Sequence, residues 1–169
     1  HDPAGRNWVI DPIDGTNNFL AGLGHFAVCI GLLDRGEPVL GVVYDVTHGA
    51  MYAAARGCGA TLNDRPIRVR ETPLSSASMI MMTSNVIDKT GRCPRWAEIL
   101  IGQTTWKIRI LGSAAIEAVQ VAAGVAHAAI TVNGKLWDCV APAAIVRESG
   151  GIVSGLLGQA VFPFDLNDY

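Results

Sequence analysis

The sequence has 169 residues, which suits one ordinary domain with a single hydrophobic core. Half of its residues are apolar and only 17% are charged, so the composition excludes an intrinsically disordered chain. Thirteen basic and 15 acidic residues give a net charge of -2 without any run of like charge, which disfavours a general nucleic-acid binder and a membrane-surface protein. We therefore expect a small-molecule partner.

The longest apolar segment, residues 111–132, predicts a buried helix rather than a membrane span, because Glu117, Gln120 and His127 interrupt it. The sequence opens without the basic and apolar regions of a secretory signal, so a cytoplasmic location is expected. Four widely spaced cysteines show no zinc-ligand pattern and are expected to be reduced thiols: Cys29, Cys58, Cys93 and Cys139.

Short apolar runs between turn residues predict an antiparallel meander in the first part of the chain. Its strands are expected at residues 8–10, 26–33, 39–44, 50–54, 60–62 and 67–69. The first of these strands runs into a turn at Asp11, and the second and third are joined by a hairpin loop.

Strands and helices alternate in the second part of the chain, which predicts an α/β arrangement. Strands are expected at residues 78–83, 107–111, 129–132 and 152–154, and helices at residues 94–100, 113–128 and 138–149. A Thr-Pro and Ser-Ser interruption at 71–76 suggests a weak division into residues 1–72 and 73–169.

Asp11 and Asp14 stand three residues apart at the end of the first predicted strand, within the segment Asp-Pro-Ile-Asp-Gly-Thr. Its turn can aim both carboxylates and the Ile13 carbonyl into one small volume, and such oxygen ligands suit Mg²⁺. Gly15 and Thr16 then open a helix, whose free backbone N–H groups favour a phosphate. The same residues also suit a plain turn with a helix cap, so the pattern alone leaves both interpretations open.

A second acidic position lies in the second part of the chain. Asp138 follows Trp137 at the predicted start of the helix that ends before Gly150 and Gly151. At a helix N-terminus an aspartate can serve as a cap and nothing more, so this position is also ambiguous when taken alone.

Together, the two acidic segments resemble the two signatures of the inositol monophosphatase family, magnesium-dependent and lithium-sensitive phosphatases of the fructose-1,6-bisphosphatase-like superfamily. Residues 8–19 match the first signature and residues 137–151 the second. Further segments that look like the family are 41–44, 51–52, 57–60 and 112–115, so the resemblance covers essentially the whole chain. It implies an α/β (α+β) fold, the layered αβαβα sandwich, here without the N-terminal helical layer and the extreme C-terminus.

The resemblance also implies the metal ligands, position by position. Asp11 would bridge two ions, the Ile13 carbonyl would bind the first, and Asp14 and Asp138 would complete the second. Two or three Mg²⁺ ions per site and inhibition by Li⁺ are expected. Residues 1–72 would then supply metal and phosphate binding, and residues 73–169 would complete the active site.

The resemblance places the substrate against two loops. Backbone N–H groups of Gly15 and Thr16 would hold the phosphate, and the Thr16 hydroxyl would orient the attacking water. Gly112, Ser113 and Ala114 would face the substrate with their backbone and with the Ser113 hydroxyl, although the same residues could form only a helix N-cap. The implied reaction is direct in-line displacement by water, without a phosphoenzyme.

Two departures from the family pattern bear on activity and specificity. A metal-binding Glu, part of a Glu-Glu pair, precedes the first signature in the family, and the present sequence begins at His1. Inositol phosphatases carry a Glu about seven residues before the position of Asp138, where Thr131 stands here, so weak selectivity for inositol is expected. Lys135 could add a cation for a second anionic group, or it could be a solvated loop lysine.

These observations predict a Mg²⁺-dependent phosphomonoesterase that acts on a small metabolite similar to inositol monophosphate. One alternative is a nucleotide 3′-phosphate or sugar bisphosphate as the substrate. Another alternative, from a different class, is a non-catalytic fragment that acts as a scaffold. The expected partner is a small phosphate ester rather than a nucleic-acid polymer or a membrane, and the resemblance implies a homodimer.

The remaining histidines and tryptophans are expected to be structural. His25 and His48 are interpreted as isolated loop or strand-end residues, and His127 as a residue on a helix face. Trp8 and Trp137 flank the acidic motifs and are expected to pack beneath them as part of the core.

Overall fold

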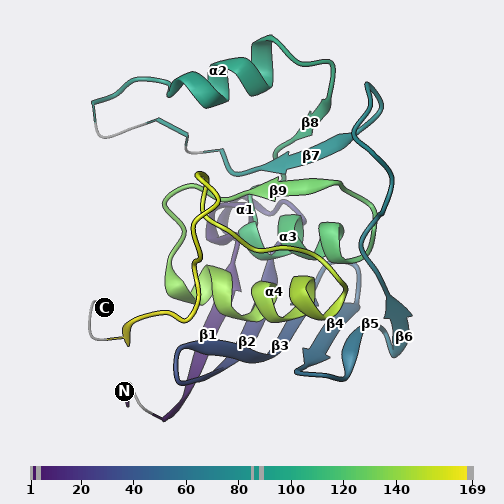
Figure 1. The fold of residues 1–169 in the computed structure, drawn as a ribbon, viewed down its shortest axis with the longest axis vertical. Coiled ribbons are helices and arrows are strands. Elements are labelled where there is room, and N and C mark those ends of the chain that lie inside the picture. Colours follow the sequence, from purple (N-terminus) through teal and green to yellow (C-terminus); the bar gives the residue numbers. More distant parts are fainter. Residues whose placement is uncertain (1, 3–4, 85, 88–89, 167–169) are drawn as a thin grey trace.

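The computed structural model describes residues 2, 5–84, 86–87 and 90–166, and helices and sheets alternate in layers along its longest axis (Figure 1). Helix α2 lies at one end, followed by a small sheet, then by helices α3 and α4, and finally by a large sheet (Figure 1). This arrangement agrees with the layered α/β fold expected from the sequence.

The large sheet is a six-stranded antiparallel meander in the order β1-β2-β3-β4-β5-β6. Its strands are β1 (Arg6–Asp14), β2 (Ala27–Asp34), β3 (Glu37–Asp45), β4 (Ala50–Ala55), β5 (Gly59–Leu62) and β6 (Arg65–Ile67). A short helix, α1 (Thr16–Ala21), connects the first two strands. The predicted meander is confirmed, but β1 continues past its predicted end to Asp14.

The second sheet is parallel and has three strands in the order β8-β7-β9. Its strands are β7 (Met79–Met82), β8 (Lys107–Arg109) and β9 (Ala128–Ile130), and the helices of this part are α2 (Arg95–Gly102), α3 (Ala114–Ala122) and α4 (Leu136–Glu148). Because α4 covers the large sheet, residues from the second part of the chain share a core with the first. The division near residue 72 stays a prediction.

Two predicted elements differ from the structure. The helix predicted to reach residue 128 ends at Ala122, because Gly124 adopts a left-handed conformation with φ 70° that stops the helix. His127 therefore lies in a bend before β9, and its predicted place on a helix face is wrong. The strand predicted at 152–154 is also wrong, since this segment has no regular structure.

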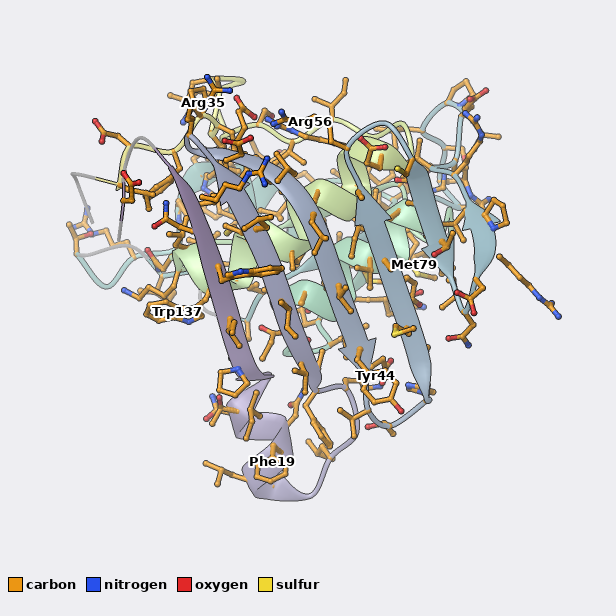
Figure 2. All side chains as sticks on the ribbon, turned by 90° about the horizontal axis from the view of Figure 1, so that it is seen from below. Phe19, Arg35, Tyr44, Arg56, Met79 and Trp137 are labelled. Atoms are coloured by element: carbon orange, nitrogen blue, oxygen red, sulfur yellow. The ribbon has the colours of Figure 1, made fainter. Side chains whose placement is uncertain are left out.

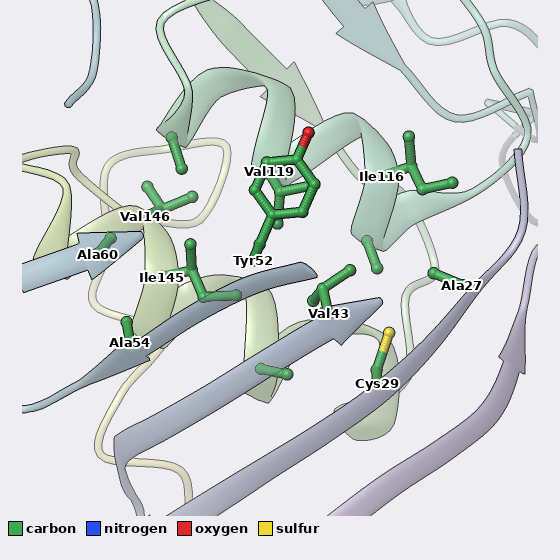
Figure 3. Packing of buried hydrophobic residues seen from close by; sticks show 13 residues of the cluster. Ala27, Cys29, Val43, Tyr52, Ala54, Ala60, Ile116, Val119, Ile145 and Val146 are labelled. Atoms are coloured by element: carbon green, nitrogen blue, oxygen red, sulfur yellow. The ribbon is translucent and has the colours of Figure 1, made fainter. Parts of the chain in front are cut away.

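The main core lies between the large sheet and helices α3 and α4. Val43 and Tyr52 of the sheet point toward the α3 residues Ile116 and Val119 (Figure 3). Helix α4 comes so close to β2 and β3 that a Cβ on Gly41 would overlap the backbone of Ala141. Glycine is therefore required where the helix backbone rests directly on the sheet.

The opposite face of the large sheet is not covered by these helices (Figure 2). Trp8 is 62% exposed on this face, and Ile10 and Tyr44 are also exposed. Trp137 is 40% exposed, and together with Trp8 it lines a cavity of about 390 Å³ at the edge of the sheet. The prediction that both tryptophans pack in the core is therefore wrong.

Among the described residues, every helix is too short or too polar to span a lipid bilayer.

Candidate metal and phosphate site

A bulge near the end of β1 turns Asp11 and Asp14 toward the same face of the large sheet. Asp11 is paired with Cys29 and Asp14 with Ala27, so three steps along β1 match two steps along β2. In a regular strand, residues three positions apart point to opposite faces of the sheet. The extra residue of the bulge brings Asp11 and Asp14 to the same face. Both side chains therefore face the helices, and the two residues are only 8% and 5% exposed.

Asp138 reaches the same place from the first turn of α4. One carboxylate oxygen from each of Asp11, Asp14 and Asp138 lies within 4.8 Å of the others, which confirms the predicted convergence of the two acidic segments. The Asp138 carboxylate also accepts a hydrogen bond of 2.7 Å from the N–H of Lys135. Asp138 is therefore both a helix-capping residue and a member of this carboxylate triad.

The electrostatics of the carboxylate triad favour a cation. Burial raises the pKa of Asp14 to about 6, and the charges of Asp138 and Asp11 add to this rise, while hydrogen bonds from Ser113 and Ala115 oppose it. Burial is also the main cause of the raised pKa of Asp11. None of the ion pairs found in the described part of the chain involves these carboxylates. Three oxygen donors with unbalanced negative charge fit a hard divalent ion such as Mg²⁺.

The turn after β1 links Asp11, Ile13 and Thr16 by hydrogen bonds. The Ile13 N–H donates to the Asp11 carboxylate at 3.0 Å, which fixes the side chain of Asp11. The Thr16 hydroxyl donates to the Ile13 carbonyl at 2.9 Å, and a carbonyl oxygen can accept a second partner through its other lone pair. The carbonyl of Ile13 and the hydroxyl of Thr16 are thus held beside the carboxylate triad.

Hydrogen bonds from Ser113 and Ala115 hold the carboxylate of Asp14 in place. The Ser113 hydroxyl donates a hydrogen bond to the Asp14 carboxylate and accepts one of 3.2 Å from the N–H of Ile116. Asp14 accepts a further hydrogen bond of 3.1 Å from the N–H of Ala115. Because Ser113 is almost fully buried, its hydroxyl positions Asp14 and does not face open space.

Two supporting residues were not identified from the sequence. Glu117 is fully buried and one of its carboxylate oxygens accepts the N–H groups of Leu111 and Gly112, at 2.7 and 3.1 Å. The Asn18 amide donates to the carbonyls of Leu111 and His25, at 2.7 and 2.8 Å. For Glu117, the available sequence signal was a charged residue within a helix predicted to be buried. No sequence signal indicated the role of Asn18.

The two predicted substrate loops meet at Gly15. This residue has φ 83°, and a Cβ on it would lie 2.8 Å from the His25 carbonyl and 3.1 Å from the Ser113 Cβ. Glycine is required for both reasons, since a side chain would be strained and would collide with the neighbouring loop. The start of α1 and the Gly112–Ala114 loop are therefore adjacent, with Gly112 and Thr16 exposed.

Thr131 lies on the Asp138 side of the carboxylate triad. A Cβ on Gly134 would be 2.7 Å from the Thr131 methyl group and 3.9 Å from the Asp138 carboxylate, so both residues border the same glycine. Lys135 is exposed next to Asp138. The structure thus brings the predicted specificity position to the edge of the candidate site.

The expectation for the cysteines agrees with the structure, whereas the expectation that His25 and His48 are isolated does not. The four cysteines are free, and burial raises the pKa of the Cys29 thiol, which therefore stays protonated. His25 and His48 do not stand apart as predicted, because their ring centroids are 5.5 Å from each other.

Comparisons with known proteins support a single family. A family model described as "Inositol monophosphatase family" matches residues 1–169. The chain is 37% identical to the Nus factor SuhB of Xylella fastidiosa over 89% of its own length and 55% of the relative's. It is 38% identical to the fructose-1,6-bisphosphatase/inositol-1-monophosphatase of Thermotoga maritima, over 96% of its own length and 61% of the relative's.

A solved structure shows the same likeness in three dimensions. The inositol monophosphatase from Anabaena superposes with a TM-score of 0.86 at 32% identity, and the match covers 94% of the present chain and 64% of that protein. The chain therefore spans less than two thirds of the length of these relatives.

Proposed function

The chain belongs to the inositol monophosphatase family, and from this premise we propose that it carries the catalytic centre of a Mg²⁺-dependent phosphomonoesterase. Its substrate is a small phosphate ester similar to inositol monophosphate. The observation that carries the proposal is the convergence of Asp11, Asp14 and Asp138 beside the Gly15 turn. Similar relatives named as phosphatases support it.

The carboxylates of Asp11, Asp14 and Asp138, with the Ile13 carbonyl, hold the metal ions in this proposal. When bound, two or three Mg²⁺ ions supply the positive charge that activates a water and stabilises the leaving oxygen. We further propose that Li⁺ inhibits the protein. Within the carboxylate triad, the hydrogen bonds from Ser113 and Ala115 keep Asp14 ionised despite its burial.

The first turn of α1 positions the phosphate in this proposal. Backbone N–H groups at the start of a helix have no partner within the helix, and in this proposal those of Gly15 and Thr16 bind the phosphate. The Thr16 hydroxyl donates its hydrogen bond to the Ile13 carbonyl. Its oxygen lone pairs therefore remain to accept a hydrogen bond from the attacking water. The backbone of Gly112, Ser113 and Ala114 faces the substrate across this turn.

Direct attack by water fits the side chains around the carboxylate triad. A phosphoenzyme would need a nucleophile, but the Ser113 hydroxyl is buried under Asp14. The Cys29 thiol is also buried, and its raised pKa keeps it protonated. In this proposal the reaction proceeds in one displacement step, by attack of water.

Two other functions remain as competing outcomes. The name of the Thermotoga relative favours a sugar bisphosphate as a second substrate class, and a nucleotide 3′-phosphate belongs to the same alternative. The Xylella relative is named as a Nus factor and not as a phosphatase, and on this ground we keep the non-catalytic scaffold as the second alternative. We also propose, from the family resemblance, a cytoplasmic homodimer.

The test is a phosphate-release assay on the longest polypeptide that contains this chain. Inositol 1-phosphate, fructose 1,6-bisphosphate and 3′-AMP are compared with and without Mg²⁺. The proposal expects Mg²⁺-dependent hydrolysis that Asp14→Asn abolishes and Asp64→Asn, a change at an exposed turn, leaves intact. Absence of hydrolysis for all substrates in the presence of Mg²⁺ supports the scaffold alternative.

A further inference from the structure

Another cavity, with mostly apolar walls, has none of the carboxylate triad among its lining residues. It has a volume of about 360 Å³ and is open between the large sheet, α3 and β7. Its walls include two histidines and one aspartate, and none of the triad residues: the lining is His25, Asp45, His48, Ala50, Tyr52, Met81, Leu111, Ile116 and Gln120. The proposed phosphatase reaction uses none of these side chains.

His48 is held in place by a buried carboxylate. Its Nδ1 is 2.8 Å from one carboxylate oxygen of Asp45, and its backbone N–H donates to the other at 3.2 Å. The Asp45 side chain is 4% exposed at the end of β3, whereas that of His48 is 55% exposed. With Nδ1 engaged by Asp45, Nε2 is the nitrogen that remains for a ligand. A carboxylate that orients a histidine in this way is typical of metal sites.

His25 is fixed on the other side of the same cavity. Its backbone has φ 66°, a left-handed conformation that is uncommon for a residue other than glycine, and the Asn18 amide holds its carbonyl at 2.8 Å. Within the described part of the chain, the His25 ring has no hydrogen-bond partner. Strained backbone of this kind concentrates at functional positions.

The separation of the two rings matches shared coordination of one ion. Their centroids are 5.5 Å apart and their planes meet at 35°. Two imidazole nitrogens that bind one tetrahedral zinc ion at ~2.1 Å each hold their ring centroids roughly 5 Å apart. The observed centroid separation of 5.5 Å is close to this value.

We propose that His25 and His48 form a second metal site, which binds a divalent transition-metal ion such as Zn²⁺ and in which Asp45 orients His48. Water occupies the remaining coordination positions. Imidazole nitrogens select transition metals, whereas the all-oxygen carboxylate triad selects Mg²⁺, so the two sites differ in the ion they take. The proposed phosphatase reaction uses neither histidine side chain.

The experiment is a Zn²⁺ titration of the chain in excess Mg²⁺, followed by NMR of the histidine ring nitrogens. Mg²⁺ occupies the carboxylate triad, and the ring signals identify the ligands directly. We expect the signals of His25 and His48 to shift, those of His127 to stay, and the dissociation constant to lie below ~100 µM.

Matched variants separate the two metal sites. His48→Gln and His25→Asn are each expected to weaken Zn²⁺ binding at least tenfold, and Asn is suitable at position 25 because it tolerates a positive φ. Asp45→Asn is expected to weaken binding by about 10- to 100-fold. The control His127→Gln, in the bend before β9, leaves binding unchanged.

The Asp14→Asn variant decides between the two ion sites. If it leaves Zn²⁺ binding intact while the His25 and His48 variants lose it, the second site is supported. The proposal is overturned if Asp14→Asn abolishes Zn²⁺ binding and the histidine variants retain it. It is also overturned if the rings of His25 and His48 show no shift when Zn²⁺ is added to the folded wild-type chain.

Discussion

Asp14→Asn tests the electrostatic account of the carboxylate triad, because it removes one charge and keeps the size of the side chain. Burial, the largest cause, raises the pKa of Asp14 from 3.8 to about 6. This rise of about 2 units corresponds to roughly 3 kcal/mol of unfolding free energy. In the metal-free chain, the folded state is therefore less stable with Asp14 ionised than with Asp14 neutral.

The sign of the pH dependence follows from proton binding. Between about pH 4 and pH 6 the folded chain holds the Asp14 proton that the unfolded chain has released, so the stability of the wild type falls as pH rises through this window. Asparagine mimics the neutral carboxyl and can still accept hydrogen bonds from Ser113 and Ala115. We expect Asp14→Asn to be more stable than the wild type at pH 8 without metal, by up to ~3 kcal/mol.

The assay is urea unfolding between pH 5 and pH 8, with EDTA or with Mg²⁺. Mg²⁺ at 100 times its dissociation constant stabilises a one-site protein by about 2.7 kcal/mol, and this gain is expected for the wild type only. Asp64→Asn is the matched control, since Asp64 is exposed and its φ of 62° suits asparagine.

Two results would refute this reasoning. A lower stability of Asp14→Asn in EDTA at pH 8 would mean that the folded chain favours the charged carboxylate, contrary to the effect of burial. An equal gain from Mg²⁺ in both proteins would mean that Asp14 is not a metal ligand.

Three further changes test the fold, the support of the site and the specificity. Gly41→Ala should destabilise the chain by ~1–3 kcal/mol in urea unfolding, because its Cβ would overlap Ala141, whereas Gly102→Ala, with open space around it, should not. Ser113→Ala should weaken Mg²⁺ binding about tenfold in a calorimetric titration, more at pH 6 than at pH 8, because its hydroxyl keeps the pKa of Asp14 down. Thr131→Glu should raise the preference for inositol 1-phosphate over glycerol 2-phosphate, measured as the ratio of the two kcat/KM values in the longest polypeptide that contains this chain. The wild type should prefer inositol 1-phosphate by at most about tenfold, and a preference of about a hundredfold would contradict the inference that Thr131 makes the selectivity weak.

Elements with a strong local pattern were predictable. Burial alternates along the whole of β2, and this period of two is visible in the apolar run of the sequence. The segment 152–154 lacks regular structure although it is apolar, because a short apolar run forms a strand only when a neighbouring strand offers hydrogen bonds. The predicted helix passed the observed end of α3 for a different reason: apolar residues continue on both sides of Gly124, whose left-handed backbone stops the helix.

The convergence of the three acidic residues was predictable, but their supporting contacts were not. The positions of Asp11, Asp14 and Asp138 at a strand end and a helix start are ambiguous when taken alone, and the family resemblance is what joins them. The hydrogen bond between Ser113 and Asp14 joins residues 99 positions apart, and no local pattern specifies such a contact. The pairing of His25 with His48 likewise depends on how the turn after β3 folds back beside β2.

The same contact between α4 and the large sheet that stabilises the core also sets the geometry of the carboxylate triad. Asp11 and Asp14 are fixed to β1 by the strand ladder, whereas Asp138 is fixed only as part of α4. The distance between them therefore depends on how closely the helix approaches the sheet, and Gly41 permits that approach because a Cβ there would meet the backbone of Ala141. A shift of α4 by about 1 Å would be large compared with the ~2.1 Å of a Mg²⁺–oxygen bond, which demands near-ideal geometry. We therefore expect Gly41→Ala to weaken Mg²⁺ binding along with stability, although Gly41 lies outside the site.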